Sequence, residues 1–167
     1  MVKKADAIFR GQVTAINSSW EGTGANLHIS TFVTFNVLKT LKGTVSSPYT
    51  LQLLGGTVDG KTLVVVGMPK FNVGDINLLF VVNNGTQICP LVGMMHGYFR
   101  VQNQNGADIV LRSNGQALHG TSEIDAIHQK AVAADGLTNS PSITSSTPPT
   151  QLQDFENAIQ QQVSAGP

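Results

Sequence analysis

LHISTFVTFNVLKTLKG, residues 27–43, is the stretch that decides the fold of this chain. Side chains alternate along it, with Thr31, Val33, Phe35 and Val37 on one face, which is the pattern of a half-buried β-strand. A strand of about ten residues at ~3.3 Å per residue spans over ~30 Å. Such a length suits a strand that bends and pairs with different neighbours at its two ends, as closure of a small barrel requires. We therefore expect this strand to curve around a closed barrel.

Further strand-like segments lie on both sides of this stretch, separated by turn signals such as Asp59-Gly60 and Asn84-Gly85, which favour tight hairpins. They recur about every eight to twelve residues, and no helical crossover interrupts residues 6–118. This pattern is typical of an antiparallel barrel or sandwich and argues against a parallel α/β sheet. The further predicted strands are residues 6–17, 49–56, 61–67, 76–82, 86–92, 97–103, 107–113 and 117–120.

Helices are expected only towards the C-terminus. Residues 121–134 and the segment after residue 150 carry apolar side chains every three or four positions, the spacing of an amphipathic helix. Between them the composition is rich in Ser, Thr and Pro, as in a linker. We therefore divide the chain into a β-barrel domain with a trailing helix (1–134), a linker (135–149) and a C-terminal amphipathic helix (150–167) packed on the barrel.

Composition and charge exclude some classes of partner. Charged residues make up 12% of the chain, about half of the roughly 25% typical of soluble domains. Lys and Arg together number 10, as do Asp and Glu, so the formal net charge is zero. Nucleic-acid binding requires a basic excess, and membrane insertion requires about 20 apolar residues in a row; neither is expected. The polar, weakly charged composition suits an exported bacterial protein, secreted or periplasmic, whose signal segment is absent from this chain.

The sequence contains no recognisable catalytic or metal-binding motif. Its one cysteine, Cys89, lies in an apolar run and is either a small buried hydrophobe or a reactive thiol. No G-x-S-x-G nucleophile motif occurs. No two histidines are spaced as zinc ligands usually are. We therefore expect no catalytic residue, no metal site and no cofactor. The histidines are His28, His96, His119 and His128.

Two places could contact a ligand. Trp20 and Glu21 lie in the predicted loop between the first two strands, where Trp20, the only tryptophan, would be either a contact anchor or a cover for the barrel end. Met94 and Met95, in GMMHGYF (93–99), would form either an adaptable surface or barrel filling. We take Trp20 and Glu21 as the candidate binding residues and the methionines as filling.

Two segments of the chain resemble known families. ADAIFRGQVTAI (5–16), followed by a loop and ISTFVTFNVLKTLKG (29–43), resembles the opening of netrin-like modules, including tissue inhibitors of metalloproteinases. The matching residues are Ala5, Asp6, Ile8, Gly11, Val13, Val37, Leu38, Lys42 and Gly43. The chain is also similar to uncharacterised exported bacterial proteins. That similarity rests on Gly67, Pro69, Phe71, Gly74, Asp75, Leu79 and Phe80, and on Gly97, Phe99, Arg100 and Val101.

The netrin-like resemblance implies a fold and limits the function. The implied fold is mainly β: an OB-like, closed antiparallel β-barrel with additional hairpins and one or two C-terminal helices. Inhibitors of this family chelate a protease zinc through an N-terminal cysteine, which this chain lacks. We therefore expect a non-enzymatic, exported protein-binding or accessory domain whose partner is another secreted or surface protein. The alternatives are a protease inhibitor that acts through a loop, and a hydrolase whose site assembles only in three dimensions. The oligomeric state stays open.

Overall fold

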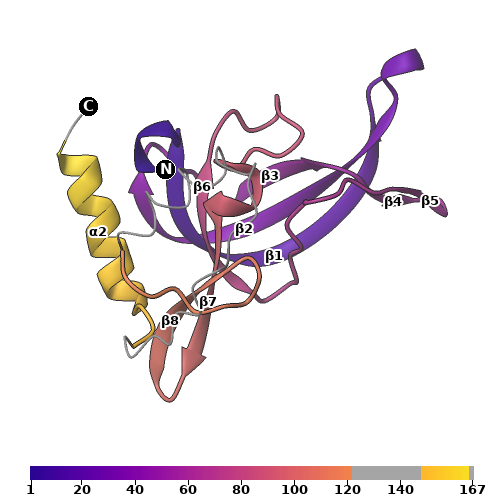
Figure 1. Ribbon diagram of the computed structural model, residues 1–167. Coiled ribbons are helices and arrows are strands. Elements are labelled where there is room, and N and C mark those ends of the chain that lie inside the picture. The colour runs from indigo at the N-terminus through magenta and orange to yellow at the C-terminus, as the bar shows by residue number, and fades with distance from the viewer. Residues whose placement is uncertain (122–147, 166–167) are drawn as a thin grey trace, which may run out of the picture.

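The computed structural model describes residues 1–121 and 148–165 as a β-sheet protein with one C-terminal α-helix (Figure 1). The helix predicted over residues 121–134 and nearly all of the predicted linker lie outside the described residues. The strands are β1 (Ala7–Glu21), β2 (His28–Lys42), β3 (Tyr49–Leu54), β4 (Gly56–Val58), β5 (Lys61–Leu63), β6 (Ile76–Val81), β7 (Tyr98–Gln104) and β8 (Ala107–Arg112). The helices are η1 (Val2–Lys4), η2 (Gly24–Asn26), η3 (Met94–Gly97) and α2 (Leu152–Ser164).

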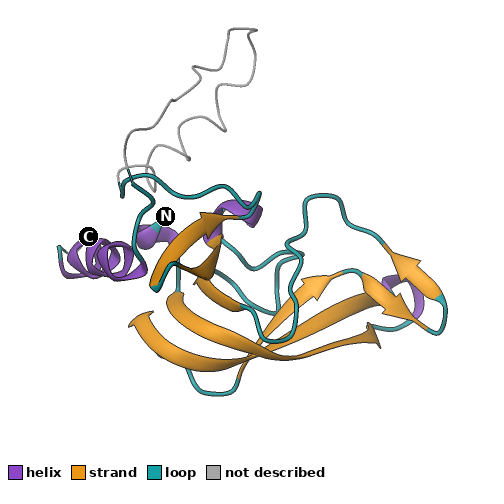
Figure 2. Cartoon of the chain, turned by 90° about the horizontal axis from the view of Figure 1, so that it is seen from below, coloured by secondary structure: helices purple, strands orange, loops and turns teal. Residues whose placement is uncertain are grey.

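Six strands form one antiparallel sheet in the order β3-β2-β1-β6-β7-β8, and β4 and β5 form a separate hairpin. Figure 2 shows the sheet from below, with the long strands curving past the others. The prediction of a mainly β, antiparallel fold with a C-terminal helix is confirmed. The two ends of the sheet order, β3 and β8, do not pair with each other in the described part of the chain.

The predicted long strand is β2, and it pairs with β1 from Lys42 at one end to His28 at the other. Three register shifts interrupt this ladder; at one of them Leu38 is an extra residue in β2 between two successive pairs. Bulges of this kind bend a strand and increase its twist. β1 also pairs with β6, but only over Ala7–Gln12, and β2 pairs with β3 only over Ser30–Phe35. We call the far halves of these strands, Val13–Glu21 of β1 and His28–Phe35 of β2, the ribbon; β3 pairs along its β2 side, and only the tip at Trp20–Glu21 and His28–Ile29 extends beyond β3.

Apolar side chains cover both faces of the sheet. Neighbouring residues of β1 and β6 alternate between two buried clusters: Ile8 and Phe80 belong to one, and Phe9 and Leu79 to the other. The first cluster includes Leu152, Phe155 and Ile159 of α2, so the helix covers that face. The second, interior cluster comprises Ala7, Phe9, Val13, Val33, Phe35, Leu51, Leu53, Leu79, Val81, Cys89, Leu91 and Tyr98.

Within residues 1–121 and 148–165 the strands do not close into the predicted barrel, and residues 86–92, predicted as a strand, form a loop. Residues 82–92, the closing segment, bind β3 through Leu54 N–H to Ile88 O (2.9 Å) and continue β6 through Val82 N–H to Pro90 O (3.0 Å). The strand predicted over residues 86–92 is wrong: only Leu91 forms an isolated bridge, to Val81. Pro90 has no N–H to donate to a ladder, so the segment can pair only at separate points.

Two other predicted strands are shorter than expected. The strand predicted over residues 61–67 ends at Leu63, because Leu63 pairs with Gly56 while Gly55 instead donates its N–H to Ile29 O at 2.8 Å. The residues after Leu63 therefore have no residue of β4 to pair with. Residues 117–120 contribute only the bridge between Ala117 and Leu111.

Candidate functional site

The predicted contact residue Trp20 lies in a strand and not in a loop. β1 continues to Glu21, and Trp20 pairs with Ile29 of β2. Lys61 of β5 places its Nζ 5.7 Å from the centroid of the Trp20 ring, within the range of a cation–π contact. The Trp20 side chain is still 36% exposed, so it is partly covered by the β4–β5 hairpin and partly open to a partner.

Two glycines let the β4–β5 hairpin fold over the ribbon. Gly55 and Gly56 have φ of 106° and 136°, which side-chain-bearing residues rarely adopt. Thr31 Oγ1 donates to Gly55 O at 2.6 Å and lies 2.9 Å from Ser18 Oγ. A Cβ at Gly56 would clash with both hydroxyls. The close approach of backbone to this hydroxyl pair fixes where the hairpin crosses the ribbon.

This end of the molecule exposes large apolar side chains. We call Trp20, Leu27, Val64 and Val66 the distal surface; the last three are 52%, 76% and 90% exposed. Leu27 lies in the turn between β1 and β2, and the two valines directly follow β5. Figure 1 shows both hairpins extending away from α2, at the opposite end of the sheet.

A polar pocket of about 370 Å³ lies next to the ribbon, and Glu21 lines it. Successive residues of a strand point to opposite faces, so Glu21 and Trp20 serve different surfaces. The pocket brings together the end of β1, the start of β2, β3 and the closing segment. Its lining residues are Glu21, Gly22, His28, Ser30, Gln52, Leu54, Gly85, Thr86, Gln87 and Ile88.

Short hydrogen bonds hold the polar groups of this pocket. Glu21 Oε1 accepts from Ser19 Oγ at 2.9 Å, and His28 Nδ1 donates to Asn26 O at 2.7 Å. Gln52 Nε2 donates to Ser30 Oγ at 3.3 Å, and Thr86 Oγ1 donates to Asn83 O at 2.9 Å. Sequence analysis singled out only Glu21 of this group. The other residues come from segments far apart in the chain, and no local motif marks them.

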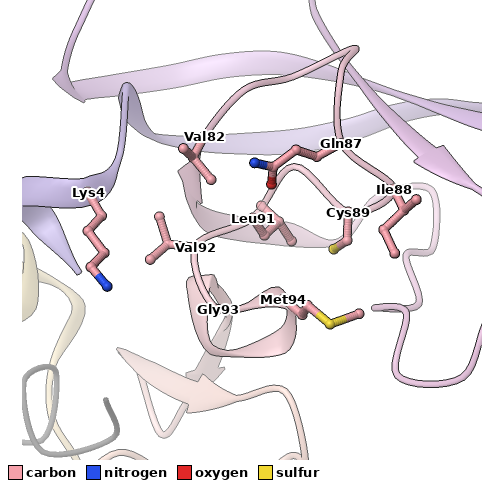
Figure 3. A pocket seen from close by; sticks show the side chains of 9 residues that line it. All are labelled: Lys4, Val82, Gln87, Ile88, Cys89, Leu91, Val92, Gly93 and Met94. Carbon is pink, nitrogen blue, oxygen red and sulfur yellow. The ribbon is translucent and has the colours of Figure 1, made fainter. Parts of the chain in front are cut away.

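An apolar pocket of about 280 Å³ lies on the other side of Ile88, lined by residues of the closing segment together with Lys4 and Met94 (Figure 3). Cys89 is one of the lining residues and is 3% exposed. Burial raises the pKa of the Cys89 thiol, which disfavours the nucleophilic thiolate. The interpretation of Cys89 as a buried hydrophobe is confirmed. Met94 is 38% exposed at the pocket mouth, so the prediction that it fills the core is wrong.

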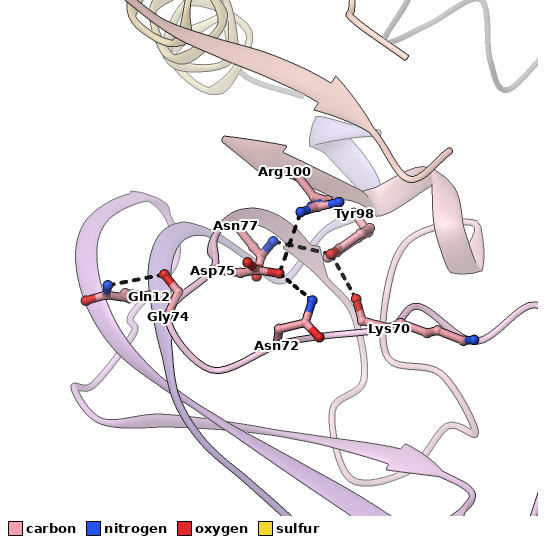
Figure 4. A network of polar contacts seen from close by, with 8 residues as sticks. All are labelled: Gln12, Lys70, Asn72, Gly74, Asp75, Asn77, Tyr98 and Arg100. Carbon is pink, nitrogen blue, oxygen red and sulfur yellow. Dashed lines mark hydrogen bonds and ion pairs between the residues drawn. The ribbon is translucent and has the colours of Figure 1, made fainter. Parts of the chain in front are cut away.

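A polar network ties the loop before β6 to β7 (Figure 4). Asp75 lies 3.9 Å from Arg100 and accepts from Asn72 at 3.0 Å. Tyr98 donates its hydroxyl hydrogen to Lys70 O at 3.0 Å. Burial raises the pKa of Tyr98 to about 12, so the hydroxyl stays protonated and keeps this hydrogen bond. The network has a clear structural role, which is to hold the loop against the sheet.

The described residues, 1–121 and 148–165, contain no group of three or more His, Cys, Asp or Glu side chains placed to hold a metal ion. Among them the structure also shows no helix with the length and apolarity needed to cross a bilayer.

Comparison with known proteins gives no neighbour: no family model, curated protein or solved structure matches the chain.

Proposed function

We propose that this chain is a non-enzymatic, exported protein-binding domain, and that its distal surface contacts another secreted or surface protein. The observation that carries the proposal is the exposure of Trp20 and Leu27 on the β1–β2 hairpin and of Val64 and Val66 in the segment that follows β5. Large exposed apolar side chains gathered in one region typically mark interaction sites, and tryptophan is the residue type most enriched among binding hot spots.

The contacts that hold Trp20 on the ribbon support this role. Trp20 is held by strand pairing to Ile29 and by the contact with Lys61, so little conformational freedom remains to be lost on binding. Preorganised contact residues raise affinity because the cost of ordering them is already met on folding.

We further propose that the fold is a variant of the OB-like, netrin-like barrel. In support, β1, β2, β3 and β6 surround one apolar interior, and residues 82–92 bind the edges of both β3 and β6. A loop thus occupies the place of a closing strand, and α2 packs on the outside.

Affinity capture from the secreted fraction of the source organism tests the function. Immobilised wild type is compared with Trp20→Ala and with Leu38→Ala, a matched control in which a 43% exposed apolar residue outside the distal surface is truncated. We expect a protein that is retained by wild type and by Leu38→Ala and lost with Trp20→Ala. Retention of the same proteins by all three would contradict the proposal. A protease as the specific partner would identify the domain as an inhibitor or regulator.

A further inference from the structure

We propose that the polar pocket beside Glu21 binds a guanidinium group, presented as an arginine side chain by the protein partner. This inference rests on the proposed function, because it assumes that the ligand belongs to a protein. It also deepens that function, since it assigns the chemistry of one contact that the apolar distal surface does not supply.

Three side-chain hydrogen-bond donors of this pocket already bond within the fold. The Nδ1–H of His28 is directed to Asn26 O, the amide of Gln52 to Ser30 Oγ, and the hydroxyl hydrogen of Thr86 to Asn83 O.

Hydrogen-bond acceptors of the pocket remain available to a ligand. Glu21 offers two carboxylate oxygens, and Oε1 receives the Ser19 hydroxyl. The carbonyl oxygen of Gln52 faces Gly85 across the pocket, 3.8 Å from where a Cβ on that glycine would stand. The Thr86 oxygen still has acceptor capacity after donating its hydrogen.

The charge and the shape of the pocket also favour a guanidinium group. The residues that line the pocket include one carboxylate and no lysine or arginine, so the pocket favours a cation. Leu54 and Ile88 supply apolar wall, and Ile88 is 55% exposed. A guanidinium carries five N–H donors on an aliphatic stem, which matches several spread acceptors beside an apolar rim. A lysine ammonium offers fewer donors from a single point.

Other ligand classes fit less well. An anion would meet the Glu21 carboxylate without a compensating cation among the lining residues. A metal ion would find only Glu21 and His28 as strong ligands there, which is fewer than stable sites use. A sugar requires donors as well as acceptors, and three side-chain donors of the pocket already bond within the fold.

Titration of the ¹⁵N-labelled full chain with N-acetyl-arginine amide, followed by NMR, tests this directly. N-acetyl-citrulline amide is the uncharged, nearly isosteric control probe. N-acetyl-lysine amide carries the same charge as the arginine probe but arranges its donors differently, so it separates the effect of charge from that of donor geometry. We expect saturable shifts of the Gln52 and Gln87 side-chain amides with a millimolar dissociation constant, weaker binding of the lysine probe, and none of citrulline.

Glu21→Gln should weaken binding of the arginine probe about tenfold, because a hydrogen-bonded charge pair is lost. Asp108→Asn removes the same charge from an exposed position of β8 and should leave binding unchanged. Equal shifts with citrulline, absence of saturation, or equal affinity of Glu21→Gln and wild type would each overturn the proposal. Trp20→Ala should not change binding of the small probe, so loss of partner capture with that variant reports on the proposed function separately.

Discussion

Glu156 is the one carboxylate that the helix α2 turns towards the sheet, and it is 4% exposed. Its Oε1 lies 3.0 Å from Arg10 Nε and its Oε2 accepts from Lys39 Nζ at 2.7 Å. Buried charges are tolerated when they are paired, so this carboxylate links α2 to both β1 and β2.

Glu156→Gln should lower the free energy of unfolding by about 1–3 kcal/mol, because it leaves two cations without their shared counter-ion. Urea denaturation measures the change. Gln160→Ala, on the exposed side of the same helix, should stay within about 0.5 kcal/mol of wild type. Equal stability of Glu156→Gln and wild type would show that the ion pairs do not hold the helix.

Tyr98 makes stability depend on pH in the alkaline range. Burial raises its pKa to about 12 in the folded chain, against about 10 in an unfolded chain. The contribution of Tyr98 to the free energy of unfolding is therefore complete below about pH 10. It is lost as the pH rises to about 12, by up to roughly 1.4 kcal/mol per pH unit. Urea unfolding at about pH 9 and about pH 11 measures this loss. Between these two pH values the free energy of unfolding should fall less for Tyr98→Phe than for wild type. Parallel curves for the two proteins would contradict this.

At the scale of elements, the exposed edge of β3 is paired by a side chain. Gln52 N–H donates to Asn84 Oδ1 at 3.0 Å, and Asn84 Nδ2 donates to Thr50 O at 2.8 Å. The Asn84 amide thus takes the place of a backbone neighbour. Unpaired edges invite association with other strands, so this residue protects the edge as well as fixing the closing segment.

Asn84→Ala should lower the free energy of unfolding by about 1–3 kcal/mol, because it leaves both edge groups unpaired, and should promote self-association. Sedimentation velocity and urea unfolding measure the two effects. Asn84→Asp keeps an acceptor for Gln52 but loses the donor to Thr50, and its effect on stability should be intermediate. A monomeric Asn84→Ala variant of wild-type stability would refute this role.

Most elements could be predicted from local pattern, and the failures have local causes. Alternation along residues 27–43 predicted β2, and similar patterns predicted β1, β3 and β6–β8. Residues 86–92 have an equally apolar pattern, but Pro90 cannot continue a ladder. The valines after Leu63 have high strand propensity, but no partner strand reaches them.

At the scale of the whole molecule, the contact between residues 82–92 and β3 and the polar pocket could not be predicted from the sequence, and the predicted closed barrel is wrong. The contact and the pocket both depend on residues 82–92 returning to β3, more than 25 positions back along the chain, and loops carry no periodic signal for such contacts. Trp20 and Glu21 were chosen as candidate binding residues because Trp20 is the only tryptophan of the sequence. Their neighbours Lys61 and Gln52 could be assigned only from the fold.

The most direct measurement of the central claim is photo-crosslinking from the distal surface. A benzoylphenylalanine replaces Leu27 in one sample and Gln160 on α2 in another, and each is irradiated with the secreted fraction of the source organism. We predict one discrete adduct from position 27 that disappears when Trp20→Ala is added, and no such adduct from position 160. The same adducts from both positions, or none from position 27, would contradict a partner at this end of the fold.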